Sequence, residues 1–224
     1  MPSEGRISAI EPQGRDSGLV AIYVDGVKQL TVHRAALKSL GLEEGATVDA
    51  DELRQLAAAA ERRAGMDAGL ALLGVRDRTA KELSERLRRK SFTQEVAGDV
   101  LGRLQELGYV DDRRYAVEFV RGRMVHRPAG RHALRGELRR KGVEAETIDE
   151  VLDECFDGVD EVAVAVGIVQ QRARRFAGLD TRTARSRLVS LLQRRGFDFE
   201  VIQEAVTRAM PEIDTDEDVA SPGE

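Results

Sequence analysis

The sequence has few of the residues that support metal sites, disulfide frameworks or membrane spans. Its 224 residues include one cysteine, three histidines and no tryptophan, and aromatic residues make up only 4%. Cys155 alone cannot form an internal disulfide, which fits a reducing compartment. The apolar runs are short and broken by charge, far below the roughly 18 to 20 apolar residues of a membrane helix. We therefore expect a cytoplasmic protein with no membrane partner.

The signatures of common enzyme classes are also missing. The chain has no Walker A loop, no Gly-x-Gly-x-x-Gly after a strand and no Gly-x-Ser-x-Gly elbow. His33, His126 and His132 are not at zinc-ligand spacing. Asp111 and Asp112 precede a predicted helix, so we interpret them as capping residues rather than as a catalytic carboxylate pair. We expect a protein that is not an enzyme and has no catalytic residue, metal or cofactor.

What the sequence does contain is charge, and the charge is segregated. Residues 76–142 carry 18 basic and 10 acidic side chains, whereas residues 143–161 carry nine acidic side chains and no basic one. Residues 211–224 carry six acidic side chains and no basic one, with few apolar residues. Blocks this uneven favour a polyanionic or acidic partner. We expect residues 211–224 to form a disordered acidic tail.

The N-terminal region, residues 1–65, predicts a β-hairpin followed by helices. Residues 19–24 and 27–32 are rich in β-forming side chains and are joined by Asp25-Gly26, a strong hairpin signal. Residues 6–11 are a weaker candidate for a third strand. A short helix is predicted from His33 to about Gly41, and a second from Asp49 or Asp51 onward, with a hinge at Gly65.

The remaining helical part contains an internal repeat. Residues 83–92, 134–143 and 188–197 share leucines four apart followed by a basic-Gly-Phe-like corner, at offsets of 51 and 54 residues. Apolar spacing on both sides of each corner predicts two amphipathic helices joined by a tight turn. A further helix precedes each pair, at residues 68–74, 113–125 and 161–177. The predicted fold is mostly α, with three tandem three-helix, helix-turn-helix-like modules at residues 66–110, 111–157 and 158–210.

Local signals agree with these boundaries. Thr79 with Glu82 forms a capping-box pattern, and Thr93 and Asp198 stand where N-caps are expected. Ser91 occupies the corner position that is glycine in the other two modules. The first corner must therefore use a different conformation or accept strain.

A family resemblance is carried by the junction of the first two modules. The stretch Gly108-Tyr-Val-Asp-Asp112, together with the repeated corner, resembles the RecX family of regulatory proteins over roughly residues 15–210. The resemblance implies a non-catalytic modulator of the RecA recombinase, usually an inhibitor, that acts in DNA repair, recombination and the SOS response. It also implies binding within the groove of the RecA filament on single-stranded DNA, and an ability to bind DNA itself.

The predicted contact residues are arginines of the middle module. Arg131, Arg135 and Arg139 recur every four residues as a stripe opposite Leu134 and Leu138, and Arg114 and Arg121 add charge from the preceding helix. The aligned positions of the other modules are Ala80, Ser84 and Arg88, and Arg185, Val189 and Gln193. We expect the stripe to contact the RecA filament or its single- or double-stranded DNA; otherwise it is a solvated face, and the next candidates are Arg172, Arg174 and Arg175.

Two other functions are compatible with this pattern. A helix-turn-helix transcription factor would need basic or amide side chains on the third helix of a module. Residues 144–154 of the middle module are acidic instead, which disfavours that function. A helical adaptor that never meets nucleic acid is the second alternative. For each function we expect a monomer.

Overall fold

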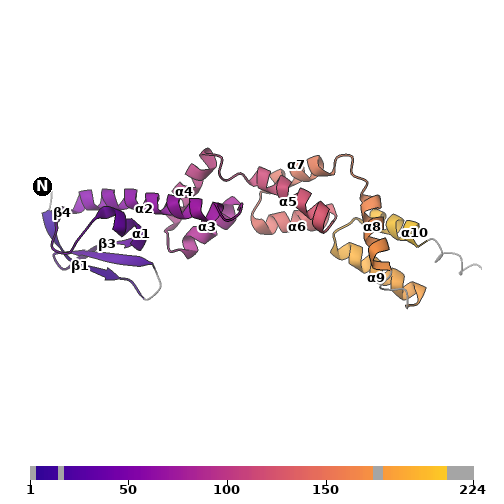
Figure 1. The fold of residues 1–224 in the computed structure, drawn as a ribbon, viewed down its shortest axis with the longest axis horizontal. Coiled ribbons are helices and arrows are strands. Elements are labelled where there is room, and N and C mark those ends of the chain that lie inside the picture. The colour runs from indigo at the N-terminus through magenta and orange to yellow at the C-terminus, as the bar shows by residue number, and fades with distance from the viewer. Residues whose placement is uncertain (1–3, 15–17, 174–178, 211–224) are drawn as a thin grey trace, which may run out of the picture. The chain divides into compact units, whose positions relative to one another are not determined.

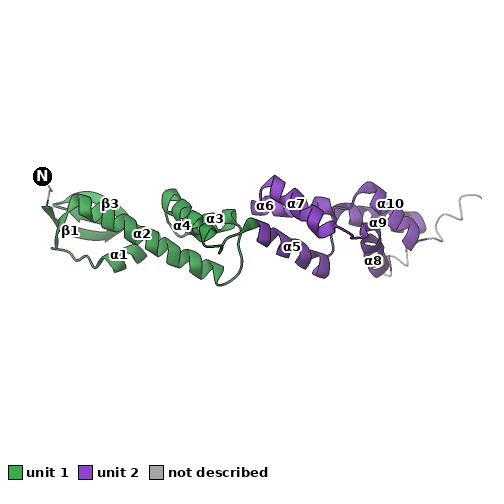
Figure 2. Cartoon of the chain, turned by 90° about the horizontal axis from the view of Figure 1, so that it is seen from above, with its two compact units in different colours: residues 1–112 green, residues 113–224 purple. Residues whose placement is uncertain are grey.

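The computed structural model describes residues 4–14, 18–173 and 179–210, which form ten helices and four strands (Figure 1). The chain divides into two compact units, residues 1–112 and 113–224 (Figure 2). The expected acidic tail, residues 211–224, lies outside the described residues. So do Arg174, Arg175 and the expected end of a helix at residue 177.

The first unit begins with a four-stranded antiparallel sheet in the order β3-β2-β1-β4. The strands are β1 (Glu4–Pro12), β2 (Leu19–Val24), β3 (Val27–His33) and β4 (Thr47–Asp49). Asp25 and Gly26 join β2 to β3 with φ angles of 49° and 78°. Two adjacent left-handed residues are the requirement of the hairpin turn that the Asp-Gly pair predicted. The expected third strand is β1, whereas β4 was not predicted.

Two helices pack against the sheet. Helix α1 (Arg34–Leu40) ends at Gly41, which adopts a left-handed φ of 61°, as predicted. Helix α2 (Ala50–Leu73) begins at Asp49, whose carboxylate accepts hydrogen bonds from two backbone amides of the first turn. The core between α2 and the sheet contains Ile7, Ile22, Val24, Val32, Leu53 and Ala57.

Helix α2 also belongs to the first module, because it runs through Gly65 without a break. The hinge expected there is absent. A Cβ atom at Gly65 would lie 3.0 Å from a methyl group of Val100, and one at Gly69 would lie 2.9 Å from a methyl group of Leu104. These glycines therefore allow α2 to pack closely against the third helix of the module.

Each module has the predicted three helices. The first combines the second half of α2 with α3 (Ala80–Arg89) and α4 (Gln94–Glu106). The second contains α5 (Asp112–His126), α6 (Arg131–Lys141) and α7 (Ala145–Phe156). The third contains α8 (Glu161–Ala173), α9 (Thr181–Arg194) and α10 (Phe199–Ala209). Each module encloses its own apolar core.

The repeat is visible in these cores. The equivalent leucines Leu87, Leu138 and Leu192 are all 0% exposed. The corner side chains that follow them, Phe92, Val143 and Phe197, are buried as well. Burial at equivalent positions confirms the alignment of the three segments.

The three corners share one backbone conformation. Ser91, Gly142 and Gly196 have φ angles of 71°, 87° and 75°. The next backbone amide donates to a leucine carbonyl five residues earlier, at 3.2 Å or 3.3 Å, in all three modules. This is the Schellman end of a helix. Ser91 therefore accepts the strain of the left-handed region rather than changing the turn.

Candidate interaction surface of the second and third modules

The arginine stripe of α6 lies beside the buried leucines rather than opposite them. At about 100° per residue, Arg131 is only about 20° around the helix from Leu138, and Arg139 is about 100° from it. Exposure follows this order: the side chains of Arg131 and Arg135 are 32% and 38% exposed, and Arg139 is exposed. The expectation of opposite faces was wrong, although the three arginines do follow one row of α6.

Arg131 is held at the edge of the module core. Its guanidinium contacts Asp153 of α7, with Nη1 2.6 Å from Oδ1, and Glu161 of α8, with Nε 3.2 Å from Oε1. The same group lies 4.9 Å from the centre of the Phe156 ring. Because α8 belongs to the third module, Arg131 also links the second module to the third.

Arg135 and Arg139 differ in their surroundings. Arg135 Nη2 lies 2.7 Å from Asp149 Oδ1 on α7, and this carboxylate is 57% exposed. Arg139 forms no ion pair with any residue that the structure describes. Exposed ion pairs contribute only about 0 to 1 kcal/mol, so an anionic partner could replace Asp149 at little cost. Arg139 can contact an anionic partner without breaking an existing ion pair.

Helix α5 also directs arginines toward α7. Arg113 and Arg121 share Glu154, whose carboxylate oxygens lie 2.6 Å and 3.7 Å from their Nη2 atoms. Arg114 is exposed on the same helix. The acidic helix α7 therefore pairs with arginines of α5 and α6 together. Sequence reasoning noted both the basic stripe and the acidic helix but did not foresee that they pair.

The aromatic residues of α5 are engaged inside the module. The rings of Tyr115 and Phe119 are stacked with centroids 6.3 Å apart, and Lys141 Nζ lies 5.4 Å from each centroid. Phe119 also packs against the core. Cys155 packs there too, and partial burial raises the pKa of its thiol. Neither observation supports base stacking or thiol chemistry.

The second and third modules meet through backbone atoms. The amide of Gly130 donates to the carbonyl of Arg195 at 2.8 Å, and the amide of His132 donates to the carbonyl of Gly196 at 3.2 Å. The carbonyls of the corner after α9 thus satisfy free amides at the start of α6, which has no side-chain cap. A Cβ atom at Gly130 would lie 2.2 Å from Gly196 O, so the contact requires glycine.

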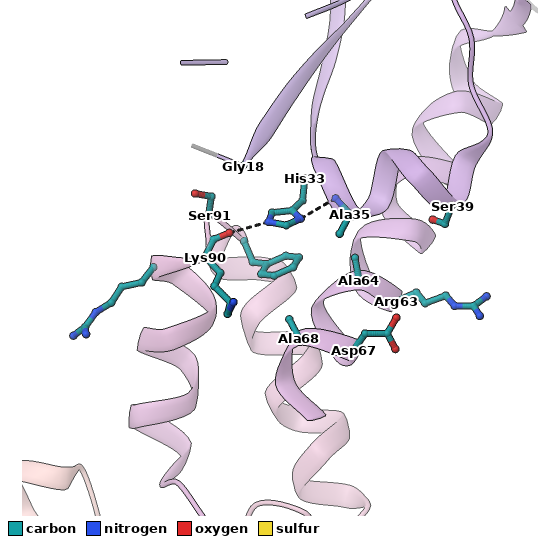
Figure 3. A pocket seen from close by; sticks show the side chains of 12 residues that line it. Gly18, His33, Ala35, Ser39, Arg63, Ala64, Asp67, Ala68, Lys90 and Ser91 are labelled. Atoms are coloured by element: carbon teal, nitrogen blue, oxygen red, sulfur yellow. Dashed lines mark hydrogen bonds between the residues drawn. The ribbon is translucent and has the colours of Figure 1, made fainter. Parts of the chain in front are cut away.

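A pocket of about 420 Å³ lies in the first unit, where the N-terminal region meets the corner of the first module (Figure 3). His33 crosses it: its Nδ1 accepts from the Ala35 amide at 3.2 Å, and its Nε2 lies 2.9 Å from the carbonyl of Lys90. Nδ1 therefore carries the lone pair and Nε2 the proton. The imidazole is also stacked on Phe92, with centroids 4.3 Å apart.

Other candidate chemistry is accounted for by packing. Asp112 accepts a hydrogen bond from the Ala80 amide at 2.8 Å, so it caps α3 although it opens α5. The described residues contain no group of three or more metal-ligating side chains. Within the same residues, no helix is long and apolar enough to cross a membrane.

Family models match each module in turn. The models of the first, second and third three-helix domains of RecX match residues 66–104, 111–152 and 160–206. The regulatory protein RecX of Amycolatopsis mediterranei is 38% identical over 126 residues, which cover 56% of this chain and 71% of that protein. The chain belongs to the RecX family.

The similarity to RecX proteins extends beyond the modules. The regulatory protein RecX of Bacillus subtilis is 28% identical over 212 residues, covering 95% of this chain and 79% of that protein. A crystal structure of a regulatory protein RecX shares 25% identity with a TM-score of 0.64, and the match covers 89% of this chain and 97% of that one. The resemblance seen in the sequence is thereby confirmed, and a regulatory role follows from it.

Proposed function

We propose that this RecX family member is a non-catalytic regulator that binds the RecA nucleoprotein filament and inhibits its ATPase and recombinase activities in DNA repair and recombination. The observation that carries the proposal is the set of three consecutive RecX three-helix domains, found in proteins named as regulatory. Three modules in series offer a repeated surface, which suits a partner that is itself a repeating polymer.

The contact surface proposed for the filament or its DNA is the stripe Arg131, Arg135 and Arg139, with Arg114 and Arg121 beside it. Arg139 supports this assignment best, since it is exposed and has no ion-pair partner among the described residues. Arg131 is a poorer test of binding. Its contacts with Asp153, Glu161 and Phe156 make it part of the module packing as well.

The test is a titration of the protein into RecA on single-stranded DNA while ATP hydrolysis and strand exchange are measured. Both rates should fall as the protein is added. Arg139→Glu should weaken the inhibition, whereas Arg88→Glu, at the aligned position of the first module, is the matched control with the same charge change. Unchanged rates of ATP hydrolysis and strand exchange at saturating protein would refute the proposed function. An equal loss of inhibition in the two variants would show that the stripe has no special role.

Sequence-specific DNA readout remains the weaker alternative. The third helices of the three modules, α4, α7 and α10, each carry more acidic than basic side chains. Helix α7 contains five acidic residues and no basic one. A recognition helix of this charge would be repelled by the phosphates that border the major groove.

A further inference from the structure

A second group of arginines gathers where the second module meets the third, and few carboxylates accompany it. We call it the junction cluster. It contains side chains from α5, the loop after α5, α6, α8 and the corner after α9: Arg123, Arg127, Arg140, Arg172 and Arg195.

Hydrogen bonds fix two members of the junction cluster against the loop after α5. Arg123 Nη1 donates to the carbonyl of Arg127 at 2.6 Å. Arg195 Nη1 donates to the carbonyl of Pro128 at 2.9 Å, from a position 67 residues further along the chain. The backbone bonds of Gly130 to this same corner hold the two modules in place. The guanidinium groups are therefore positioned before any ligand arrives.

Among the described residues, Glu137 is the carboxylate that pairs with a member of the junction cluster. Its oxygens accept from Arg123 Nε at 2.9 Å and from Arg123 Nη2 at 2.7 Å. This hydrogen bonding lowers the pKa of Glu137, and the charges of Arg123, Arg140 and Arg127 lower it further. Within the described part of the chain, Arg127, Arg140, Arg172 and Arg195 form no ion pair. Five arginines and one glutamate leave a formal charge of +4.

The charges around Arg195 are mutually repulsive. Its pKa is lowered first by burial and then by the positive charges of Arg127, Arg172 and Arg123. Positive groups held close together with little neutralisation gain most from an added anion, and guanidinium groups bind phosphate oxygens through two parallel hydrogen bonds. The α6 stripe lacks this property, because acidic residues of α7 and α8 already pair with Arg131 and Arg135.

We propose that the junction cluster is a binding site for phosphate groups of single-stranded nucleic acid, built jointly by the second and third modules. The choice of a nucleic acid rests on the proposed function, since a regulator of a nucleoprotein filament meets single-stranded DNA. The fixed arginines Arg123 and Arg195 position the site. Arg127, Arg140 and Arg172 supply charge without forming an ion pair with any described side chain.

The test uses fluorescence anisotropy of a labelled single-stranded oligonucleotide with the full chain and no recombinase. The variant Arg127→Gln/Arg140→Gln/Arg172→Gln removes three charges but no side-chain ion pair. The control Arg62→Gln/Arg86→Gln/Arg182→Gln makes the same change at three exposed arginines elsewhere. Each lost phosphate contact should reduce the slope of log affinity against log salt by about 0.7, so three should reduce it by about 2. Binding should then be about a hundredfold weaker at 0.1 M salt and equal near 1 M salt.

A variant that adds positive charge to the junction cluster separates an effect on binding from an effect on folding. Glu137→Gln keeps an acceptor for Arg123 but adds a net positive charge to the junction cluster, so the oligonucleotide should bind more tightly. Structural damage would weaken binding instead. Wild-type slope and affinity in the triple variant, an equal loss in the control, or weaker binding by Glu137→Gln would each overturn the inference.

Two competitors distinguish the source of the anion. Excess pyrophosphate should displace the oligonucleotide only at millimolar concentration, since it offers a single pair of phosphates, and polyglutamate should compete less well than pyrophosphate. Equal competition by polyglutamate would mean that the junction cluster recognises charge alone and would overturn the assignment to phosphate. Oligonucleotide binding without RecA inhibition would refute only the proposed function, and inhibition without loss of binding in the triple variant would refute only this inference.

Discussion

The corners of the first and third modules are alike in sequence and backbone conformation, but different groups contact them. Lys90 and Arg195 occupy equivalent positions, and each offers its carbonyl to a segment that precedes the module. Lys90 O contacts the imidazole of His33, beside a pocket of about 420 Å³. Arg195 O receives the backbone amide of Gly130 directly.

This difference explains why serine is tolerated at one corner and not expected at the other. Ser91 lines the pocket, so its side chain has room. A Cβ atom at Gly196 would lie 2.2 Å from the backbone nitrogen of Ala133. The corner thus contacts a preceding segment of the chain in two of the three modules. The corner carbonyl meets a side chain in the first unit, whereas it meets a main-chain amide in the second.

The largest expected effect comes from Gly196→Ala. The new methyl group would meet the backbone of α6 and would also disfavour the φ angle of 75°. Overpacking costs about 1 to 3 kcal/mol and the left-handed conformation about 1 to 2, so we expect a loss of roughly 3 kcal/mol in the free energy of unfolding. Urea unfolding followed by circular dichroism measures it. A loss below about half a kcal/mol would mean that the junction between modules is not the contact described.

His33→Phe should have an intermediate effect in the first unit. Phenylalanine keeps a ring against Phe92 but loses the cap on Ala35 and the contact with Lys90 O. A lost cap costs about 1 kcal/mol and a lost hydrogen bond a similar amount, so we expect roughly 1 to 2 kcal/mol. Hydrogen exchange should increase at α1 and at the corner of the first module, with α9 unchanged. Exchange that is unchanged at α1 would contradict the role assigned to His33.

The three modules and their corners were largely predictable, because the corners depend on local sequence. Leucine spacing and a left-handed position next to a buried side chain identified all three modules before any contact was known. Strand β4 was missed because its three residues gain their structure by pairing with β1, about 40 residues earlier in the chain. The hinge expected at Gly65 was wrong because glycine permits both bending and close approach, and only the neighbouring Val100 decides between them.

The candidate surface was less predictable than the fold. Sequence spacing placed Arg131, Arg135 and Arg139 on one row, but it did not show that acidic residues of α7 and α8 face Arg131 and Arg135. Arg195 was missed altogether, since it is a corner residue like Lys90 and Lys141. Its partners come from segments that are distant in the sequence. Its place beside the module junction depends on helix packing, which periodicity alone does not determine.

Lowering the pH should have a smaller effect on stability, through Glu137 at the junction of the second and third modules. The pKa of Glu137 is lowered in the folded protein, chiefly by the hydrogen bonds from Arg123. The contribution of the ionised Glu137 to the free energy of unfolding is therefore complete above its unfolded-state pKa. This contribution is lost as the pH falls through the lower, folded-state pKa. Near-surface pairs contribute under about 1 kcal/mol. The melting temperature of the parent should fall more than that of Glu137→Gln between about pH 5 and pH 3; parallel curves would contradict this role.

The smallest expected effect is the reverse substitution at the first corner, Ser91→Gly. Glycine removes the cost of about 1 to 2 kcal/mol that a side chain has at a φ angle of 71°. It also restores about 0.5 to 1 kcal/mol of backbone entropy to the unfolded chain, which offsets part of that gain. We expect the free energy of unfolding to rise by about 0.5 kcal/mol. The paired experiment uses Ser91→Ala, which keeps the strained Cβ and should leave stability nearly unchanged. If Ser91→Gly destabilises the protein while Ser91→Ala does not, the serine corner is not strained, and the first and third corners differ in more than their neighbours.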